Sequence, residues 1–201
     1  MVADRAFSEF HNLADLPRRL AFRGPAQDFQ FARREIGRDR LEAFRDPAKT
    51  FKGLLNGVLE QDADLKAEKK ADFKTVTEKA PNSSEISDLE FAIMAVKHLK
   101  SNGIALVKNK QLIGMGCGQT SRVDALQQAI KKSKEFGFDL KGAVMASDAF
   151  FPFPDCVDIS HSVGITAISQ PGGSIKDQDS INAANKNGQA MVTTGTRHFL
   201  H

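Results

Sequence analysis

Residues 143–155 read AVMASDAFFPFPD, a short apolar run that leads into a loop of unusual composition. The apolar run predicts a short buried β-strand. The loop after it contains two acids, three phenylalanines and two prolines, so it is stiff and rich in aromatic surface. Because α/β proteins bind ligands at the carboxyl ends of their strands, we interpret this loop as one wall of a site for a flat ring. A hydrophobic corner that plugs the core is the alternative.

Helical and strand patterns alternate on both sides of this stretch. The periodicity predicts helices over 85–100, 121–136, 156–163 and 177–187, and strands over 104–107, 111–115, 143–146, 165–169 and 190–193. Asn82 or Ser83 is expected to cap the first helix. The polar residues 61–81 are expected to form a surface excursion. This order predicts the α/β class, with helices on both faces of a mixed sheet.

A second segment of interest is IGMGCGQTSR over 113–122, where a strand enters a glycine-rich turn before a helix. The three glycines permit either a close approach of the backbone to a ligand or a tight strand-to-helix connection, and both interpretations remain open. Arg122 and the N–H groups of the first helical turn would suit an anion.

The last residues, TRHFLH over 196–201, carry a cation, two histidines and an aromatic ring. Chain ends are commonly frayed, so this segment alone predicts little. We expect His198 and His201 to be ordinary surface histidines.

Composition excludes several classes of protein. The formal charge of +3 is too small to indicate binding to nucleic acid or to a membrane surface. Cys117 and Cys156 form no CxxC pair and belong to no zinc-binding pattern, so we expect reduced thiols and no metal. No apolar run is long enough to span a membrane, and the first residues lack a signal-peptide core. We therefore expect a soluble, cytoplasmic protein.

The type of basic residue changes near residue 48. Residues 1–48 contain nine arginines and no lysine, whereas residues 49–201 contain seventeen lysines and two arginines. Either residue serves on a solvated surface, so a single domain has no physical reason for this switch. We interpret 1–48 as a foreign or out-of-frame leader, in preference to an anion-binding or partner-binding arm, and 49–201 as the folded domain.

Several motifs, taken in their order and spacing, resemble one known family. They are VKHLKSN over 96–102, GMGCGQTSRVD over 114–124, VMASDAFFPF over 144–153, QPGGSI over 170–175 and RHF over 197–199. Together they resemble the AICAR transformylase / IMP cyclohydrolase family of purine biosynthesis. The resemblance covers residues 50–201 and only the carboxy-terminal part of the transformylase.

The resemblance implies both a fold and a function. Members of this family transfer a formyl group from 10-formyltetrahydrofolate to AICAR and then close the product to IMP, as bifunctional homodimers. Their transformylase part contains two cytidine-deaminase-like, three-layer α/β/α units without zinc, and this chain would supply mainly the second. The implied partners are these two small molecules, without nucleic acid or membrane. A potassium ion near Val96 and Asp148 is implied as well.

The matching motifs also imply binding residues. For AICAR the resemblance implies Asn102, Arg122, Phe150 and Arg197. For the folate it implies Val123, Asp155, Ser174 and Ile175.

The family's catalytic residues have no counterpart in this sequence. They are a lysine and a histidine in a Lys-His-Val-Ser-Pro-type motif, and the Lys97-His98 pair lies in a different motif. The family's tyrosine-containing nucleotide motif is also absent, because the chain has no tyrosine. The histidine is the proposed proton acceptor for the attacking amine, so we assign no catalytic residue. We expect an inactive, truncated transformylase without the cyclohydrolase domain. One chain of a split enzyme and a non-catalytic AICAR- or folate-binding module are the alternatives.

Overall fold

The computed structural model describes residues 49–200. They belong to two compact units divided between Leu65 and Lys66. The predicted leader, 1–48, lies outside the described residues. The part of the first unit that is described is a hairpin in which β1 (Lys49–Leu54) pairs antiparallel with β2 (Gly57–Asp62).

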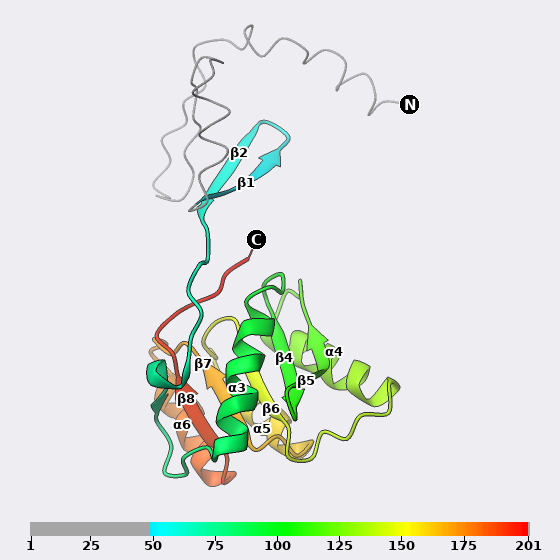
Figure 1. The fold of residues 1–201 in the computed structure, drawn as a ribbon, viewed down its shortest axis with the longest axis vertical. Helices are drawn as coiled ribbons and strands as arrows, with labels where there is room; N and C mark the ends of the chain where they lie inside the picture. Colours follow the sequence, from blue (N-terminus) through cyan, green and yellow to red (C-terminus); the bar gives the residue numbers. More distant parts are fainter. Residues whose placement is uncertain (1–48, 201) are drawn as a thin grey trace, which may run out of the picture. The chain divides into compact units, whose positions relative to one another are not determined.

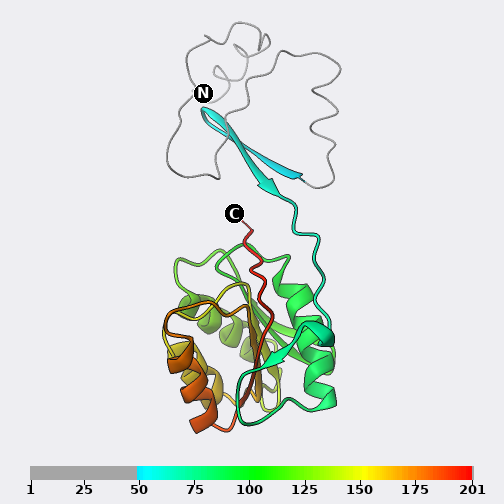
Figure 2. The same cartoon turned by 90° about the vertical axis from the view of Figure 1, so that its left-hand side faces the viewer.

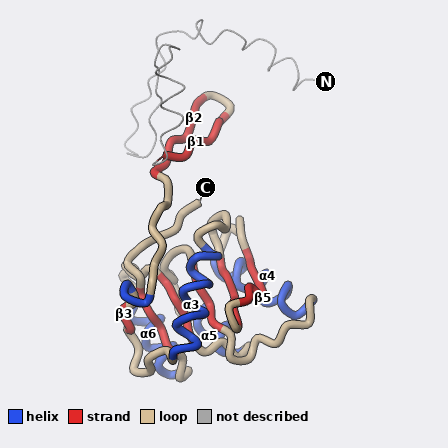
Figure 3. The backbone as a smooth tube through the Cα atoms, viewed as in Figure 1, coloured by secondary structure: helices blue, strands red, loops and turns tan. Residues whose placement is uncertain are grey.

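The described part of the second unit, residues 66–200, contains a mixed six-stranded sheet in the order β3-β8-β7-β6-β4-β5 (Figures 1 and 3). The strands β6, β7 and β8 are parallel, whereas β3, β4 and β5 run antiparallel to their neighbours. The strand bounds are Lys74–Thr75 for β3, Ile104–Lys108 for β4, Gln111–Gly116 for β5, Val144–Ser147 for β6, Ala167–Gln170 for β7 and Ala190–Thr193 for β8.

Helices cover both faces of this sheet, which confirms the α/β class and the three layers. One face carries α3 (Ser83–Val96), and the other carries α4 (Arg122–Glu135), α5 (Asp155–Ser162) and α6 (Asp177–Lys186). Figure 2 shows the sheet from its side, with α3 in green and α6 in orange on opposite sides. In the described part of the chain, no helix is long and apolar enough to cross a membrane.

The two faces of the sheet differ in side-chain size. Strand residues that face α4, α5 and α6 are mostly large, namely Ile104, Leu106, Met145, Ile168 and Met191. Strand residues that face α3 are mostly alanine and valine, namely Ala105, Val107, Val144, Ala146, Ala167, Ala190 and Val192. The alternation follows from the two-residue period of a β-strand.

The start of α3 agrees with the predicted cap. The Asn82 side chain accepts a hydrogen bond from the backbone N–H of Glu85 at 3.0 Å, and the Glu85 carboxylate accepts one from the Asn82 N–H at 2.8 Å. This reciprocal pair is a capping box. The helix ends at Val96, earlier than the predicted residue 100, because the N–H groups of His98 and Leu99 bond to carbonyls only three residues back.

The segment predicted to be a surface excursion, 61–81, takes part in the fold. It contains the end of β2, a 3-10 turn at Lys70–Asp72 (η2) and strand β3, which forms one edge of the sheet. It also buries the side chain of Glu68. A two-residue strand in a polar segment carries no periodicity, so the pattern could not reveal it.

Candidate functional site

Several loops meet at one end of the sheet. The loops after β6, β7 and β8 leave the carboxyl ends of parallel strands, which therefore lie together. Ile104, at the start of β4, pairs with Ser147 at the end of β6 and with Gly116 at the end of β5. The loops before β4 and after β5 consequently reach the same end. Residues predicted to bind ligands lie in or beside these loops, and they are Asn102, Arg122, Val123, Phe150, Asp155, Ser174, Ile175 and Arg197.

Asn102 joins two of these loops. Its side-chain amide donates a hydrogen bond to the carbonyl of Gln119 at 2.9 Å. Close by, the N–H of Gly118 donates to the carbonyl of Lys100 at 2.7 Å. The half-buried Asn102 thus holds the glycine-rich loop against the loop that precedes β4.

Arg122 begins α4, and its guanidinium is directed at the end of β6. Its Nε donates to the Ser147 hydroxyl at 2.9 Å, and its Nη2 donates to Oδ1 of Asp148 at 2.7 Å. The arginine side chain is 10% exposed and the Asp148 side chain is fully buried. Two nitrogens of the predicted anion-binding fork are therefore engaged within the protein.

Two of the three glycines in 113–122 serve packing between strand and helix. A Cβ atom on Gly114 would lie 2.5 Å from the Ala129 carbonyl oxygen, and one on Gly116 would lie 1.8 Å from that of Ala125. Both glycines therefore let the backbone of β5 approach α4. Gly118 differs, because it is exposed and has a positive φ of 66° in the loop itself. The role of Gly114 and Gly116 is thus packing of the strand on the helix, which differs from both the ligand contact and the tight turn that the sequence left open.

Phe150 and Arg197 lie together although they are far apart in the sequence. The guanidinium carbon of Arg197 is 4.6 Å from the centre of the Phe150 ring, within the range of a cation–π contact. Arg197 is exposed and Phe150 is half-buried. A Cβ atom on Gly173 would lie 3.8 Å from Nη2 of Arg197, so the loop after β7 borders the same place.

The aromatic loop divides between the core and the surface. Phe151 is fully buried in the core, and its N–H donates to the buried Gln170 side chain at 3.0 Å. Phe153 is 52% exposed, and the Lys176 ammonium lies 4.6 Å from the centre of its ring. The core-plugging interpretation is therefore correct for Phe151, whereas the ring-binding interpretation stays a prediction for Phe150 and Phe153.

The residues expected to contact folate are mostly accessible. Asp155 is exposed at the start of α5 and accepts a hydrogen bond from the N–H of Cys156 at 2.8 Å. The hydroxyl of Ser174 accepts one from the N–H of Lys176 at 3.1 Å. Ile175 is 104% exposed, and Val123 packs partly against the core under α4.

Comparison with known proteins identifies the relatives of this chain. Residues 36–132 match the family model described as AICARFT/IMPCHase bienzyme. The chain resembles this family, as its motifs predict. The match starts within the predicted leader 1–48, whose boundary stays a prediction.

Two curated relatives in this family carry the same name, Bifunctional purine biosynthesis protein PurH. The one from Bacteroides thetaiotaomicron is 63% identical over 155 residues, which are 77% of this chain and 31% of the relative. The one from Aquifex aeolicus is 53% identical over 150 residues, which are 75% of this chain and 29% of the relative. The chain thus spans less than a third of the length of these relatives.

Solved structures give weaker likenesses to this chain. A diaminohydroxyphosphoribosylaminopyrimidine deaminase/reductase from Thermotoga maritima is 20% identical, with a TM-score of 0.36 over 54% of this chain and 34% of its own. The dCMP deaminase from the cyanophage S-TIM5 is 18% identical, with a TM-score of 0.39 over 55% of this chain and 98% of its own. TM-scores this low carry no argument about ligand or activity.

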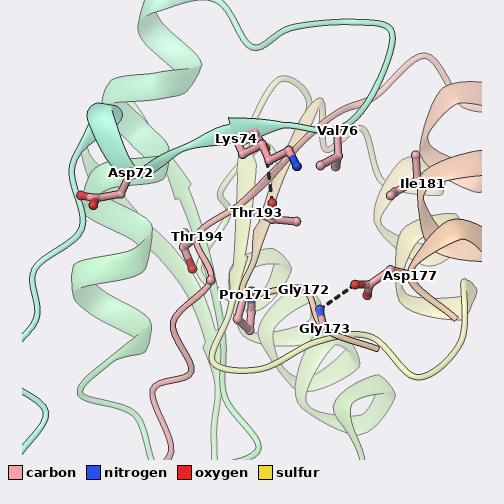
Figure 4. Close-up of a pocket in the computed structure, with 11 residues that line it drawn as sticks. Asp72, Lys74, Val76, Pro171, Gly172, Gly173, Asp177, Ile181, Thr193 and Thr194 are labelled. Atoms are coloured by element: carbon pink, nitrogen blue, oxygen red, sulfur yellow. Dashed lines mark hydrogen bonds between the residues drawn. The ribbon is translucent and has the colours of Figure 1, made fainter. Parts of the chain in front are cut away.

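A pocket of about 410 Å³ lies beside the residues that are expected to bind ligands (Figure 4). None of the eight predicted residues lines it. Its wall includes the loop 171–173, which leads directly into Ser174, and the Asp177 carboxylate, which accepts a hydrogen bond from the N–H of Gly173 at 2.6 Å. The remaining lining residues are Asp72, Lys74, Val76, Ile181, Thr193, Thr194 and Gly195.

The two cysteines are free thiols in the described structure. Cys117 is half-buried in the glycine-rich loop, whereas Cys156 is buried at the start of α5. Burial, followed by the nearby negative charge of Asp155, raises the pKa of the Cys156 thiol to about 12. Cys156 is therefore protonated at neutral pH and unsuited to act as a nucleophile.

The expectation that His198 is a surface residue is wrong. Its side chain is 2% exposed, and its Nε2 lies 3.1 Å from Oε2 of the buried Glu68. The tail is held by backbone bonds, since the His198 N–H donates to the Asp148 carbonyl at 2.9 Å and the Ser101 N–H donates to the Leu200 carbonyl at 2.9 Å. His201 lies outside the described residues.

Proposed function

We propose that this chain binds AICAR at the loop end of its sheet and 10-formyltetrahydrofolate beside it, as part of an AICAR formyltransferase of purine biosynthesis. The observation that carries the proposal is the contact of the Arg197 guanidinium with the Phe150 ring. A flat aromatic surface next to a fixed cation suits a ribonucleotide, which has a planar base and an anionic phosphate. Kinship with the two purine biosynthesis proteins supports the same assignment.

Asn102 and Arg122 complete the proposed AICAR site. Asn102 shapes the loop through its bond to Gln119. Arg122 uses Nε and Nη2 for Ser147 and Asp148, and its Nη1 group remains to donate to the ligand. Because the guanidinium is already held in place, little side-chain entropy would be lost on binding.

The folate is proposed to lie against Ile175 and Val123, with Asp155 and Ser174 as polar partners. Ile175 is an isolated apolar side chain in full contact with water. Covering such a side chain with a pterin would contribute about 1.5–3 kcal/mol. The Asp155 carboxylate would accept hydrogen bonds from the amino and ring N–H groups of the pterin.

Formyl transfer needs more than binding. The AICAR amine attacks the formyl carbon, the bond from that carbon to N10 of the folate breaks, the amine loses a proton and N10 gains one. The sequence contains no Lys-His-Val-Ser-Pro-type motif to supply the proton acceptor. We therefore assign this chain the binding of substrates, and the proton transfer to a lysine–histidine unit outside the 201 residues. A binding module without catalysis is the second candidate, and the same absence favours it.

A potassium ion near Val96 and Asp148 is compatible with the chemistry of the site. One carboxylate oxygen of Asp148, Oδ2, is buried and has no hydrogen-bond partner. A cation would satisfy this oxygen, and Asp148 with nearby backbone carbonyls would hold it. When bound, the ion would supply positive charge that fixes the loop around Phe150.

Calorimetric titration of the chain with AICAR, and separately with 10-formyltetrahydrofolate, tests the proposal. We expect both ligands to bind. Arg197→Met and Phe150→Leu should each lower the affinity for AICAR about tenfold, which corresponds to about 1.4 kcal/mol. Ile175→Ser should lower only the affinity for the folate. Lys131→Met, a change in an exposed ion pair on α4, is the matched control. The absence of heat with either ligand would refute the binding proposal.

A formyl-transfer assay separates the two candidate functions. The isolated chain is expected to show no turnover, and adding a separate polypeptide with the lysine–histidine unit is expected to restore it. Turnover by the isolated chain would contradict the assignment of proton transfer elsewhere, and failure of any added unit would favour the binding module. Light scattering during the same experiments would measure whether the chain is the homodimer that the resemblance implies.

A further inference from the structure

Two side chains outside the proposed ligand contacts form a buried pair of opposite chemical character. Glu68 precedes the turn η2, and its side chain has no solvent exposure. Its partner is His198, whose Nε2 lies 3.1 Å from Oε2 of the carboxylate. A buried carboxylate is costly unless a proton or a positive charge lies beside it, and an imidazole at this distance can supply either.

Lys66 extends this contact along the chain. Its ammonium donates to the Thr196 hydroxyl at 2.6 Å and lies 3.7 Å from Oε1 of Glu68. The segment is itself anchored, because the Lys97 ammonium donates to the Lys66 carbonyl at 2.6 Å. Residues 66–68 therefore hold residues 196–198 through two pairs of side chains, Lys66 with Thr196 and Glu68 with His198.

The other side of the tail is held by backbone bonds to Asp148 and Ser101. Residues 196–198 thus lie between two fixed parts of the molecule. Neighbouring side chains of an extended segment point in opposite directions. Accordingly, His198 is directed into the protein, and the adjacent Arg197 is directed outward over Phe150.

A shift of the tail by one residue would exchange these two orientations. It would place a guanidinium against the buried Glu68 and remove the cation from Phe150. Backbone hydrogen bonds alone do not distinguish the two registers, because each residue offers the same N–H and carbonyl. The contacts of His198 with Glu68 and of Thr196 with Lys66 do distinguish them, because a shift by one residue would break both.

We propose that Glu68 and His198 are positioning residues, which lock the register of the tail so that Arg197 lies over Phe150. The consequence for AICAR affinity rests on the function proposed above, whereas the locking of Arg197 does not. A buried polar pair that selects one register, and contributes little net stability, is an attested use of such groups in proteins.

Nuclear magnetic resonance of the side chains tests the locking without any ligand. The Phe150 ring should shift the Arg197 side-chain signals, which are assigned by their loss in Arg197→Lys. We expect Glu68→Gln and His198→Gln to abolish this ring shift, while the signals of Arg122, held by Asp148, stay in place and report that the fold is intact. Glu135→Gln, the same chemical change at an exposed position of α4, should leave both sets unchanged.

Two double variants keep the test decisive if a single change unfolds the chain. Exchanging the partners, Glu68→His with His198→Glu, is expected to restore the Arg197 ring shift. Replacing both, Glu68→Leu with His198→Leu, preserves an apolar contact and should fold without restoring the shift. A normal ring shift in the double-leucine variant, or in either folded glutamine variant, would overturn the proposal.

Affinity for AICAR gives the functional half of the test. We expect the glutamine variants to bind AICAR about tenfold more weakly, which corresponds to one weakened contact of about 1.4 kcal/mol. The exchanged pair should recover this affinity. Affinity for the folate should not change in any of these variants. If the unmodified chain binds no AICAR, the proposed function fails while the resonance test of the lock still stands. If AICAR affinity is unchanged although the ring shift is lost, the inference that the lock serves this ligand is wrong.

Discussion

Nη2 of Arg122 donates to Oδ1 of Asp148 across 2.7 Å, and the Asp148 side chain is fully buried. Removing one partner of such a pair leaves a charge in the protein interior. We predict that Arg122→Met lowers the free energy of unfolding by about 3–5 kcal/mol, measured by urea denaturation. The same loss of a cation in the more exposed pair of Lys108 with Asp139, Lys108→Met, should lower it by about 1 kcal/mol or less. Equal effects at the two sites would contradict this account.

Gly116 and the Ala125 carbonyl are so close that no side chain fits between them. We predict that Gly116→Ala destabilises the chain by about 3 kcal/mol or more, because the added methyl group forces α4 away from β5. Gly114→Ala should have a smaller effect of the same sign, since its contact is less severe. Gly53→Ala, where the methyl group meets nothing within 4 Å, is the control. Urea denaturation ranks the three variants, and a reversed order would disprove the packing role.

The raised pKa of the Cys156 thiol predicts that the stability of the chain depends on pH in the alkaline range. Its pKa is raised by burial to about 12 in the folded state, against an ordinary value of 9.0. Between these values the unfolded chain loses a proton that the folded chain keeps. Stability from this group is therefore full below pH 9 and falls above it, by up to about 1.4 kcal/mol per pH unit.

Lysines also titrate at alkaline pH, so the contribution of the Cys156 thiol is isolated by comparing the chain with Cys156→Ala. The difference in unfolding free energy between the two proteins should be constant below pH 9 and should change between pH 9 and 12. At pH 8 a thiol reagent should modify Cys117 and leave Cys156 intact in the folded chain. Rapid modification of both cysteines would show that Cys156 is accessible.

The capping box of α3 gives a prediction that depends on a single side chain. Asn82→Ala removes the bond to the Glu85 N–H and should lower the unfolding free energy by about 1 kcal/mol. Ser84→Ala changes an exposed neighbour in the first turn and should have an effect of a few tenths of a kcal/mol. Thermal unfolding followed by circular dichroism would measure both.

Elements with a long periodic pattern could be predicted from the sequence, and short ones could not. The 14-residue helices α3 and α4 and the hairpin β4–β5 lie where their apolar spacing and caps place them, except that α3 ends at Val96, before the predicted residue 100. Strand β7 begins two residues later than predicted, at Ala167, because the N–H of Ile165 bonds to Ser160 in the turn after α5. Strand β3 has no pattern of its own and depends on pairing with β8.

The candidate site was predictable only in part, and for different reasons at different residues. Composition marked the aromatic loop as a ring-binding wall, but only the family resemblance implied that Arg197 belongs with Phe150. The burial of Glu68 and His198 could not be predicted, because each is polar in sequence and becomes buried through a partner 130 residues away. Arg122 was expected to bind an anion. Its partners within the protein, Ser147 and Asp148, could not be predicted because their positions depend on the register of β6 against β4.

The unequal sizes of side chains on the two faces of the sheet have a consequence for protein engineering. Where alanines of β4, β6 and β7 meet α3, each methyl group sets how closely the helix approaches, so a larger residue has no room to turn aside. On the opposite face, leucine, isoleucine and methionine can exchange for one another with local rearrangement. A randomised library should therefore recover folded chains freely from the second face and rarely from the first.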